Sequence, residues 1–118
     1  MRKPIYIILV LIVPILVGCF NVKENALIGT YSYSTDRADM IFVYKDHSYT
    51  HKYVNSKGRV YECKGKWKYR TGYISFDDFS FFNDAGQIGS GVWMSRVEED
   101  DGKIKLIFSS DDDTYFGK

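Results

Sequence analysis

Cysteine, proline and histidine are scarce in this chain of 118 residues, which has two of each. Both prolines lie within the first 14 residues, so nothing after Pro14 interrupts a regular strand or helix in the way that proline does. The two cysteines allow at most one internal disulfide, so the fold cannot depend on a disulfide framework. The formal net charge of +1 leaves no basic excess for nucleic acid, and we expect no nucleic-acid partner.

Sequence motifs of the common enzyme classes are also missing. The sequence has no nucleophile elbow, no zinc-ligand spacing, no phosphate-binding loop and no dinucleotide fingerprint. The acidic runs 98–101 and 111–113 lie in expected turns and lack EF-hand spacing, so we expect no calcium site there. Asp77 and Asp78 are adjacent in an expected strand and would point to opposite faces, which argues against a catalytic carboxylate pair. We therefore expect a protein that is not an enzyme and has no cofactor or bound metal.

The N-terminal segment has the organisation of an export signal. Arg2 and Lys3 are followed by an almost wholly apolar run over residues 4–18. This run of about 15 residues is shorter than the roughly 20 that a membrane-spanning helix needs, and Pro14 interrupts it. We expect residues 1–18 to be a cleaved signal peptide.

The end of this segment, Leu16-Val17-Gly18-Cys19, resembles the lipobox of bacterial lipoproteins. The resemblance implies cleavage between Gly18 and Cys19 and a lipid anchor on the Cys19 sulfur, with acyl chains such as palmitate. Residues 19–26 would be the lipidated N-terminus and a short tether to the membrane. In a Gram-negative host, Phe20 in place of the retention aspartate favours the outer membrane, on its periplasmic or surface face. In a Gram-positive host the site would be the outer face of the cell membrane.

Residues 59–70 show the clearest periodicity in the chain. From Tyr61 to Arg70, aromatic and small residues occupy the odd positions and charged residues occupy the even positions. Such strict alternation predicts a strand with one buried and one solvated face. Cys63 falls on the apolar face between Tyr61 and Gly65, so we expect a packed, inert thiol.

The rest of the chain after the tether alternates short apolar stretches with turn signals. The expected strands cover residues 27–34, 38–45, 48–54, 59–70, 73–79, 89–97, 103–109 and 114–117. The sequence thus predicts an all-β domain over residues 27–118, a single small antiparallel up-and-down β-barrel of about seven or eight strands. A β-sandwich is the alternative.

Two segments share the pattern Gly-x-aromatic-x-Tyr, one at 29–33 and one at 65–69. The pattern resembles the Gly-x-Trp start of lipocalin-like barrels, in which the aromatic residue plugs one barrel end. Here the first segment has Tyr31 where the lipocalins have Trp, and the domain is shorter than a typical lipocalin. The alternative is that each glycine relieves crowding within a strand.

Two groups of side chains are candidates for binding. The aromatic and histidine residues expected inside or at the rim of the barrel are candidate ligand or partner contacts: Tyr49, His51, Tyr53, Trp67 and Tyr69. His51 is either a contacting or pH-sensitive group or a hydrogen-bonded core histidine, and His47 is expected in a solvated turn. A basic stripe is expected on the outer face, for an acidic partner, for lipid headgroups or as a solvated exterior: Lys64, Lys66, Lys68 and Arg70.

These features favour a membrane-anchored envelope lipoprotein with a non-catalytic binding role. The many aromatic residues expected inside the barrel favour protein–protein interaction or inhibition, of the kind that immunity proteins perform. A lipocalin-like carrier of a small apolar ligand is the alternative, and a structural envelope component is the third. The expected partners are the membrane, through Cys19, and an envelope protein, while the sequence leaves the oligomeric state open.

Overall fold

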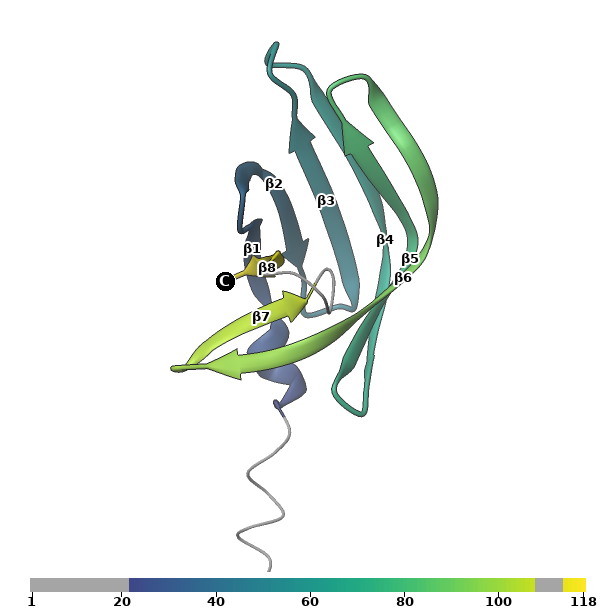
Figure 1. Ribbon diagram of the computed structural model, residues 1–118. Coiled ribbons are helices and arrows are strands. Elements are labelled where there is room, and N and C mark those ends of the chain that lie inside the picture. The colour runs from purple at the N-terminus through teal and green to yellow at the C-terminus, as the bar shows by residue number, and fades with distance from the viewer. Residues whose placement is uncertain (1–21, 108–113) are drawn as a thin grey trace, which may run out of the picture.

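A computed structural model describes residues 22–107 and 114–118 of the chain. The expected signal peptide, the cleavage site and Cys19 lie outside these residues. The described residues form an all-β closed barrel of eight antiparallel strands, each hydrogen-bonded to the next along the chain (Figure 1). The predicted up-and-down barrel is therefore confirmed, and the β-sandwich alternative is wrong.

The barrel begins with a short 3-10 helix and continues through the eight strands with tight connections. The elements are η1 (Glu24–Leu27), β1 (Gly29–Tyr33), β2 (Asp36–Val43), β3 (Ser48–Val54), β4 (Val60–Arg70), β5 (Tyr73–Asn83), β6 (Gly86–Asp100), β7 (Lys103–Ile107) and β8 (Tyr115–Gly117). Strands β3 to β6 reach further than the others, so one side of the barrel is taller (Figure 1).

Several element boundaries differ from the sequence prediction, most of all in the first, fifth and sixth strands. Leu27 belongs to η1 and not to the first strand, and β5 and β6 are both longer than expected. Strand β6 continues to Asp100, so the predicted loop 98–102 shrinks to a turn at Asp101 and Gly102. Both turn residues have positive φ, 52° and 77°, as the tight primed turns of hairpins require. The end of the expected strand 103–109 lies outside the described residues.

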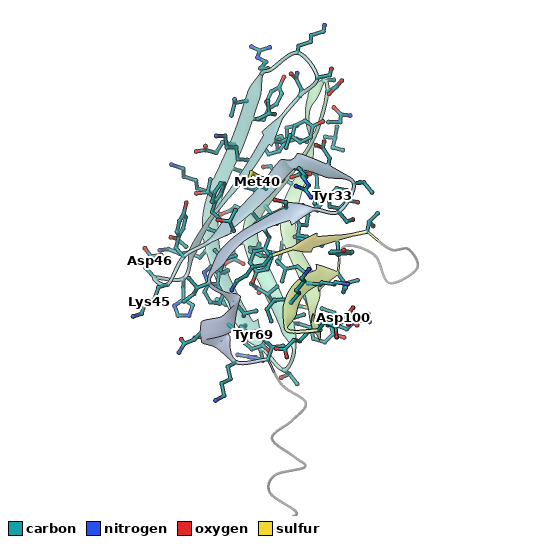
Figure 2. All side chains as sticks on the ribbon, turned by 90° about the vertical axis from the view of Figure 1, so that its left-hand side faces the viewer. Tyr33, Met40, Lys45, Asp46, Tyr69 and Asp100 are labelled. Carbon is teal, nitrogen blue, oxygen red and sulfur yellow. The ribbon has the colours of Figure 1, made fainter. Side chains whose placement is uncertain are left out.

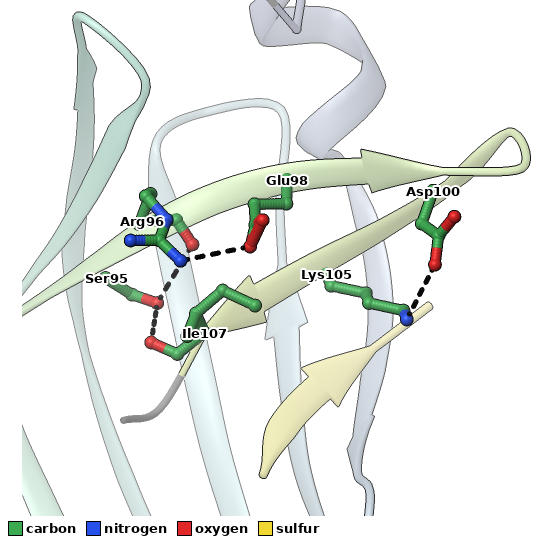
Figure 3. Close-up of polar contacts among 6 residues, drawn as sticks. All are labelled: Ser95, Arg96, Glu98, Asp100, Lys105 and Ile107. Atoms are coloured by element: carbon green, nitrogen blue, oxygen red, sulfur yellow. Dashed lines mark hydrogen bonds and ion pairs between the residues drawn. The ribbon is translucent and has the colours of Figure 1, made fainter. Parts of the chain in front are cut away.

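Strands β6 and β7 pair only over the C-terminal part of β6, from Arg96 to Asp100. The Ser95 hydroxyl donates a hydrogen bond of 2.7 Å to the Ile107 carbonyl at the start of this ladder (Figure 3). The charges beside it are paired, because Arg96 contacts Glu98 and Lys105 contacts Asp100, each at 3.2 Å (Figure 3).

The barrel interior is filled with aromatic and aliphatic side chains. The largest fully buried ones are Trp67, Tyr31, Tyr49, Phe76, Phe79 and Phe116. The buried polar groups of the aromatic residues have partners: the Trp67 indole donates to the Tyr44 carbonyl at 2.9 Å, and the Tyr31 hydroxyl donates to the Leu27 carbonyl at 2.7 Å. Such burial of a large apolar side chain contributes about 1.5–3 kcal/mol. Trp67 lies on the buried face of β4, while Lys66 and Lys68 lie on the opposite, exposed face, which confirms the predicted alternation.

A bulge in β5 opens the sheet between β4 and β5. The ladder between these strands runs from Arg70–Tyr73 to Trp67–Phe76, and the register of β5 then shifts before Phe79. Asp78, at the bulge, has a φ of 54°. A Cβ at Gly65 would collide with the Asp77 carbonyl, so the crowding explanation holds for this glycine.

Candidate functional site

The five aromatic and histidine residues that the sequence singled out do not form one surface. Tyr49, His51 and Trp67 are buried, with exposed fractions of 1%, 2% and 1%. Tyr53 and Tyr69 are only partly buried, and the Tyr53 hydroxyl donates to the Asp84 carboxylate in the β5–β6 turn at 3.4 Å. The Tyr69 hydroxyl donates to the Val22 carbonyl at 2.6 Å, beside η1, and Tyr69 lies at that end of the barrel in Figure 2. The structure instead shows two other features: a polar cluster inside the barrel and an exposed surface outside it.

The polar cluster is centred on the His51 ring. Its Nε2 lies 2.6 Å from the Asp39 Oδ1 and its Nδ1 lies 2.8 Å from the Ser80 carbonyl oxygen. A carbonyl oxygen only accepts hydrogen bonds, and so does an ionised carboxylate. Both ring nitrogens must therefore donate, so His51 is an imidazolium paired with the Asp39 carboxylate.

Aromatic rings enclose this imidazolium. The Phe79 ring stacks on His51 with 4.4 Å between centroids and an interplanar angle of 10°, and the Phe82 ring lies 5.2 Å away. Burial disfavours the charged ring, but the hydrogen bonds of Asp39, Cys63 and Ser80 and the Asp39 charge outweigh it and raise the His51 pKa to about 9. The aromatic faces favour the cation in addition.

The Cys63 thiol completes the cluster from β4. Cys63 is the direct cross-strand partner of His51, and its sulfur accepts a hydrogen bond of 3.3 Å from the Ser80 N–H. Burial would raise the pKa of the thiol, but the hydrogen bonds from His51 and from the Ser80 backbone outweigh it and lower that pKa. The expectation of a packed thiol is met only in part, because Cys63 is half-buried.

Side chains of this region also form hydrogen bonds with backbone groups of β5 at the opening between β4 and β5. The Tyr49 hydroxyl donates to the Asp77 carbonyl at 2.6 Å. The Cys63 sulfur accepts from the Ser80 N–H, and the His51 Nδ1 donates to the Ser80 carbonyl. Side chains from β3 and β4 thus satisfy backbone groups that the interrupted ladder leaves over. Asp39 was not predicted as a site residue, because only the register reveals its position: Ile41 pairs with His51, which places Asp39 diagonally across from His51.

The exposed surface lies on the outside of strands β4, β5 and β6. Met94 and Val92 of β6 are 63% and 68% exposed, and Tyr73 of β5 is 46% exposed. The register aligns Lys68 with Ser75 and Ser75 with Met94, so the basic residues of β4 lie across β5 from the apolar residues of β6. We call this surface the outer face; it consists of Lys68, Arg70, Tyr73, Val92 and Met94.

A groove of about 660 Å³ runs into the outer face near η1. Its walls include Lys68, Arg70, Tyr73 and Met94, with Glu24 at the η1 side. Glu24 lies 3.4 Å from the His47 Nε2, and the expected turn position of His47 is confirmed. The groove is therefore both cationic and apolar.

The basic residues of the outer face differ from the other cations near them. Lys64 contacts Glu62 at 3.4 Å, and Arg96 and Lys105 also have carboxylate partners. Within residues 22–107 and 114–118, neither Lys68 nor Arg70 forms an ion pair with a carboxylate. Lys68 and Arg70 are thus available for a partner, whereas the charge of Lys64 is paired with Glu62.

Comparison with protein-family models, with curated proteins and with solved structures found no match for this chain. In the described part of the chain, no three His, Cys, Asp or Glu side chains are grouped so that they could hold a metal ion. The helical residues there form no segment with the length and hydropathy needed to cross a membrane.

Proposed function

We propose that this protein is a lipid-anchored protein of the cell envelope that binds a protein partner through its outer face. The observation that carries the proposal is the contrast between a filled interior and an uncovered outer face. Trp67, Tyr49 and Phe76 occupy the space where a carried ligand would lie. Met94 and Val92, in contrast, are mostly exposed.

The outer face indicates the chemistry of its partner. Exposed apolar side chains gathered on one surface mark an interaction site, whereas single ones are ordinary. Met94, Val92 and Tyr73 would pack against an apolar centre, and Lys68 and Arg70 would meet carboxylates at its edge. The partner that fits is a protein surface with an apolar centre and an acidic rim.

The proposed anchor places this surface near a membrane. The lipobox resemblance assigns lipidation to Cys19, and the structure holds the chain at Val22 through the Tyr69 hydroxyl. The three peptide units from Cys19 to Val22 span at most about 11 Å when extended. The groove beside η1 would then lie close to the membrane, which suits inhibition or immunity against a partner that acts there.

A lipocalin-like carrier is supported less well. The barrel is closed, with eight strands, which a lipocalin-like fold requires. An eight-stranded barrel has room either for its own side chains or for one small ligand, and here aromatic side chains fill it.

The test is affinity capture of the full-length protein from its own envelope, with three chains compared. The first is the unchanged protein, the second carries Val92→Ser and Met94→Ser, and the third carries Tyr44→Ser. Tyr44 is 44% exposed but lies outside the outer face, so it is a matched surface control. A protein held in stoichiometric amount by the first and third chains but lost from the second supports the proposal.

Two other results would contradict this proposal. Retention of the same protein by all three chains would place the binding site elsewhere. Co-purification of lipid without a protein would favour carriage or contact with the membrane surface.

A further inference from the structure

The Cys63 sulfur lies beside a cationic ring and a backbone N–H, two groups that an inert core thiol does not require. Two groups beside its sulfur favour the ionised form: the Ser80 N–H, which donates to it at 3.3 Å, and the His51 ring, the cross-strand partner of Cys63. His51 is held as a cation because Asp39 and the Ser80 carbonyl accept from both of its ring nitrogens. A thiol beside a fixed cation and a backbone donor is stabilised in its ionised form.

Access to the sulfur is restricted but not closed. Cys63 is half-buried, whereas His51 beside it is only 2% exposed. The sulfur lies in the opening between β4 and β5 at the bulge. There it accepts the hydrogen bond from the Ser80 N–H that a backbone carbonyl of β4 would accept in a regular sheet. A small reagent fits such a site better than a protein disulfide does.

We propose that Cys63 is a site of oxidation by hydrogen peroxide, with His51 and Asp39 as positioning residues that keep the sulfur ionised. The thiolate attacks one peroxide oxygen, so an S–O bond forms while the O–O bond breaks. Hydroxide leaves and takes up the proton that the thiol released on ionising, which gives water. The sulfur is oxidised by two electrons to sulfenic acid, and the peroxide is reduced.

The reaction should depend on pH through the groups that face the sulfur. These groups are His51 and Tyr49 of β3, Asp39 of β2 acting through His51, the Ser80 N–H of β5, and the carboxylates Asp77 and Asp78, which act on Tyr49. The two carboxylates oppose ionisation nearby, while His51 and Ser80 favour it.

The test measures the rate of sulfenic acid formation at Cys63 in the full-length chain between pH 5 and 9. Hydrogen peroxide is the oxidant, dimedone traps the product, and mass spectrometry of the tryptic peptide Val60–Lys64 separates Cys63 from the second cysteine. We expect the pH midpoint of the folded protein to lie below that of the same chain unfolded in urea. His51→Gln should abolish this difference, and Asp39→Asn should reduce it.

The unchanged protein alone can overturn the proposal, even when a variant fails to fold. A midpoint in the folded protein at or above that of the unfolded chain would show a packed thiol that the cluster does not activate. A low midpoint that persists in a folded His51→Gln chain would remove His51 and Asp39 from their assigned role.

Discussion

The ion pair between His51 and Asp39 makes a strong prediction about the variant Asp39→Asn. Asparagine preserves the size of the side chain and an oxygen acceptor but removes the charge that holds the imidazolium. His51 is 2% exposed and the Asp39 side chain 18%, so solvent screens the pair little. The variant should therefore lose stability at every pH at which His51 is charged in the folded protein.

The size of the loss follows from the His51 pKa. Folding raises that pKa from 6.5 to about 9, which corresponds to about 3 kcal/mol of stabilisation. Because the folded pKa is the higher one, the stabilisation is fully present below pH 6.5 and is lost as the pH rises through 9. Asp39 is one of several causes, so we expect Asp39→Asn to cost about 2 kcal/mol at pH 6 and almost nothing at pH 10.

The assay is urea unfolding of both chains at pH 6 and pH 10. When the free energies of unfolding of the two chains are compared at the same pH, the contributions from ionisation of Cys63 and of the tyrosines largely cancel. Asp36→Asn is the control: it lies on the same strand and keeps the acceptor for the Ala38 N–H, and it should change stability equally at the two pH values. An equal cost of Asp39→Asn at pH 6 and pH 10 would refute the charged pair.

Three further predictions concern packing, the sheet opening and the anchor. Trp67→Ala should lower the free energy of unfolding by about 3–5 kcal/mol in urea denaturation because it empties the buried barrel end, whereas the exposed Lys68→Ala should change it by less than about 0.5 kcal/mol. Gly65→Ala should destabilise the fold, and thermal unfolding should show a lower Tm, because the new Cβ collides with the Asp77 carbonyl; an unchanged Tm would mean that the strands separate freely there. Cys19→Ala should release or mislocalise the protein in membrane fractionation, and an uncleaved chain that still sediments with membranes would favour a spanning segment.

The sequence was most informative where alternation is strict. In β4 the charged residues at even positions set one register, so the strand, its buried face and the position of Trp67 could be predicted. The N-terminal part of β6 shows no such alternation, because Gly86, Gly89 and Gly91 carry no side chains, and the start of that strand was missed. The bulge in β5 could not be predicted either, because the positive φ there falls on Asp78 and not on a glycine that would have marked it.

The candidate sites depended on information that one sequence does not contain. His51 was recognised as a residue of interest, but its partners Asp39 and Ser80 lie on other strands, and only the pairing register brings them together. The basic stripe was visible, but the ion pair that neutralises Lys64 and the apolar neighbours of Lys68 depend on the same register.

Binding of a protein partner by the outer face can be detected directly by photo-crosslinking in intact cells. Benzoylphenylalanine would replace Tyr73 in one chain and Tyr44 in another, two tyrosines that are 46% and 44% exposed. If the outer face binds a protein, we expect a discrete protein adduct from position 73 that is absent from position 44. Equal adducts from both positions, or lipid adducts alone from position 73, would contradict it.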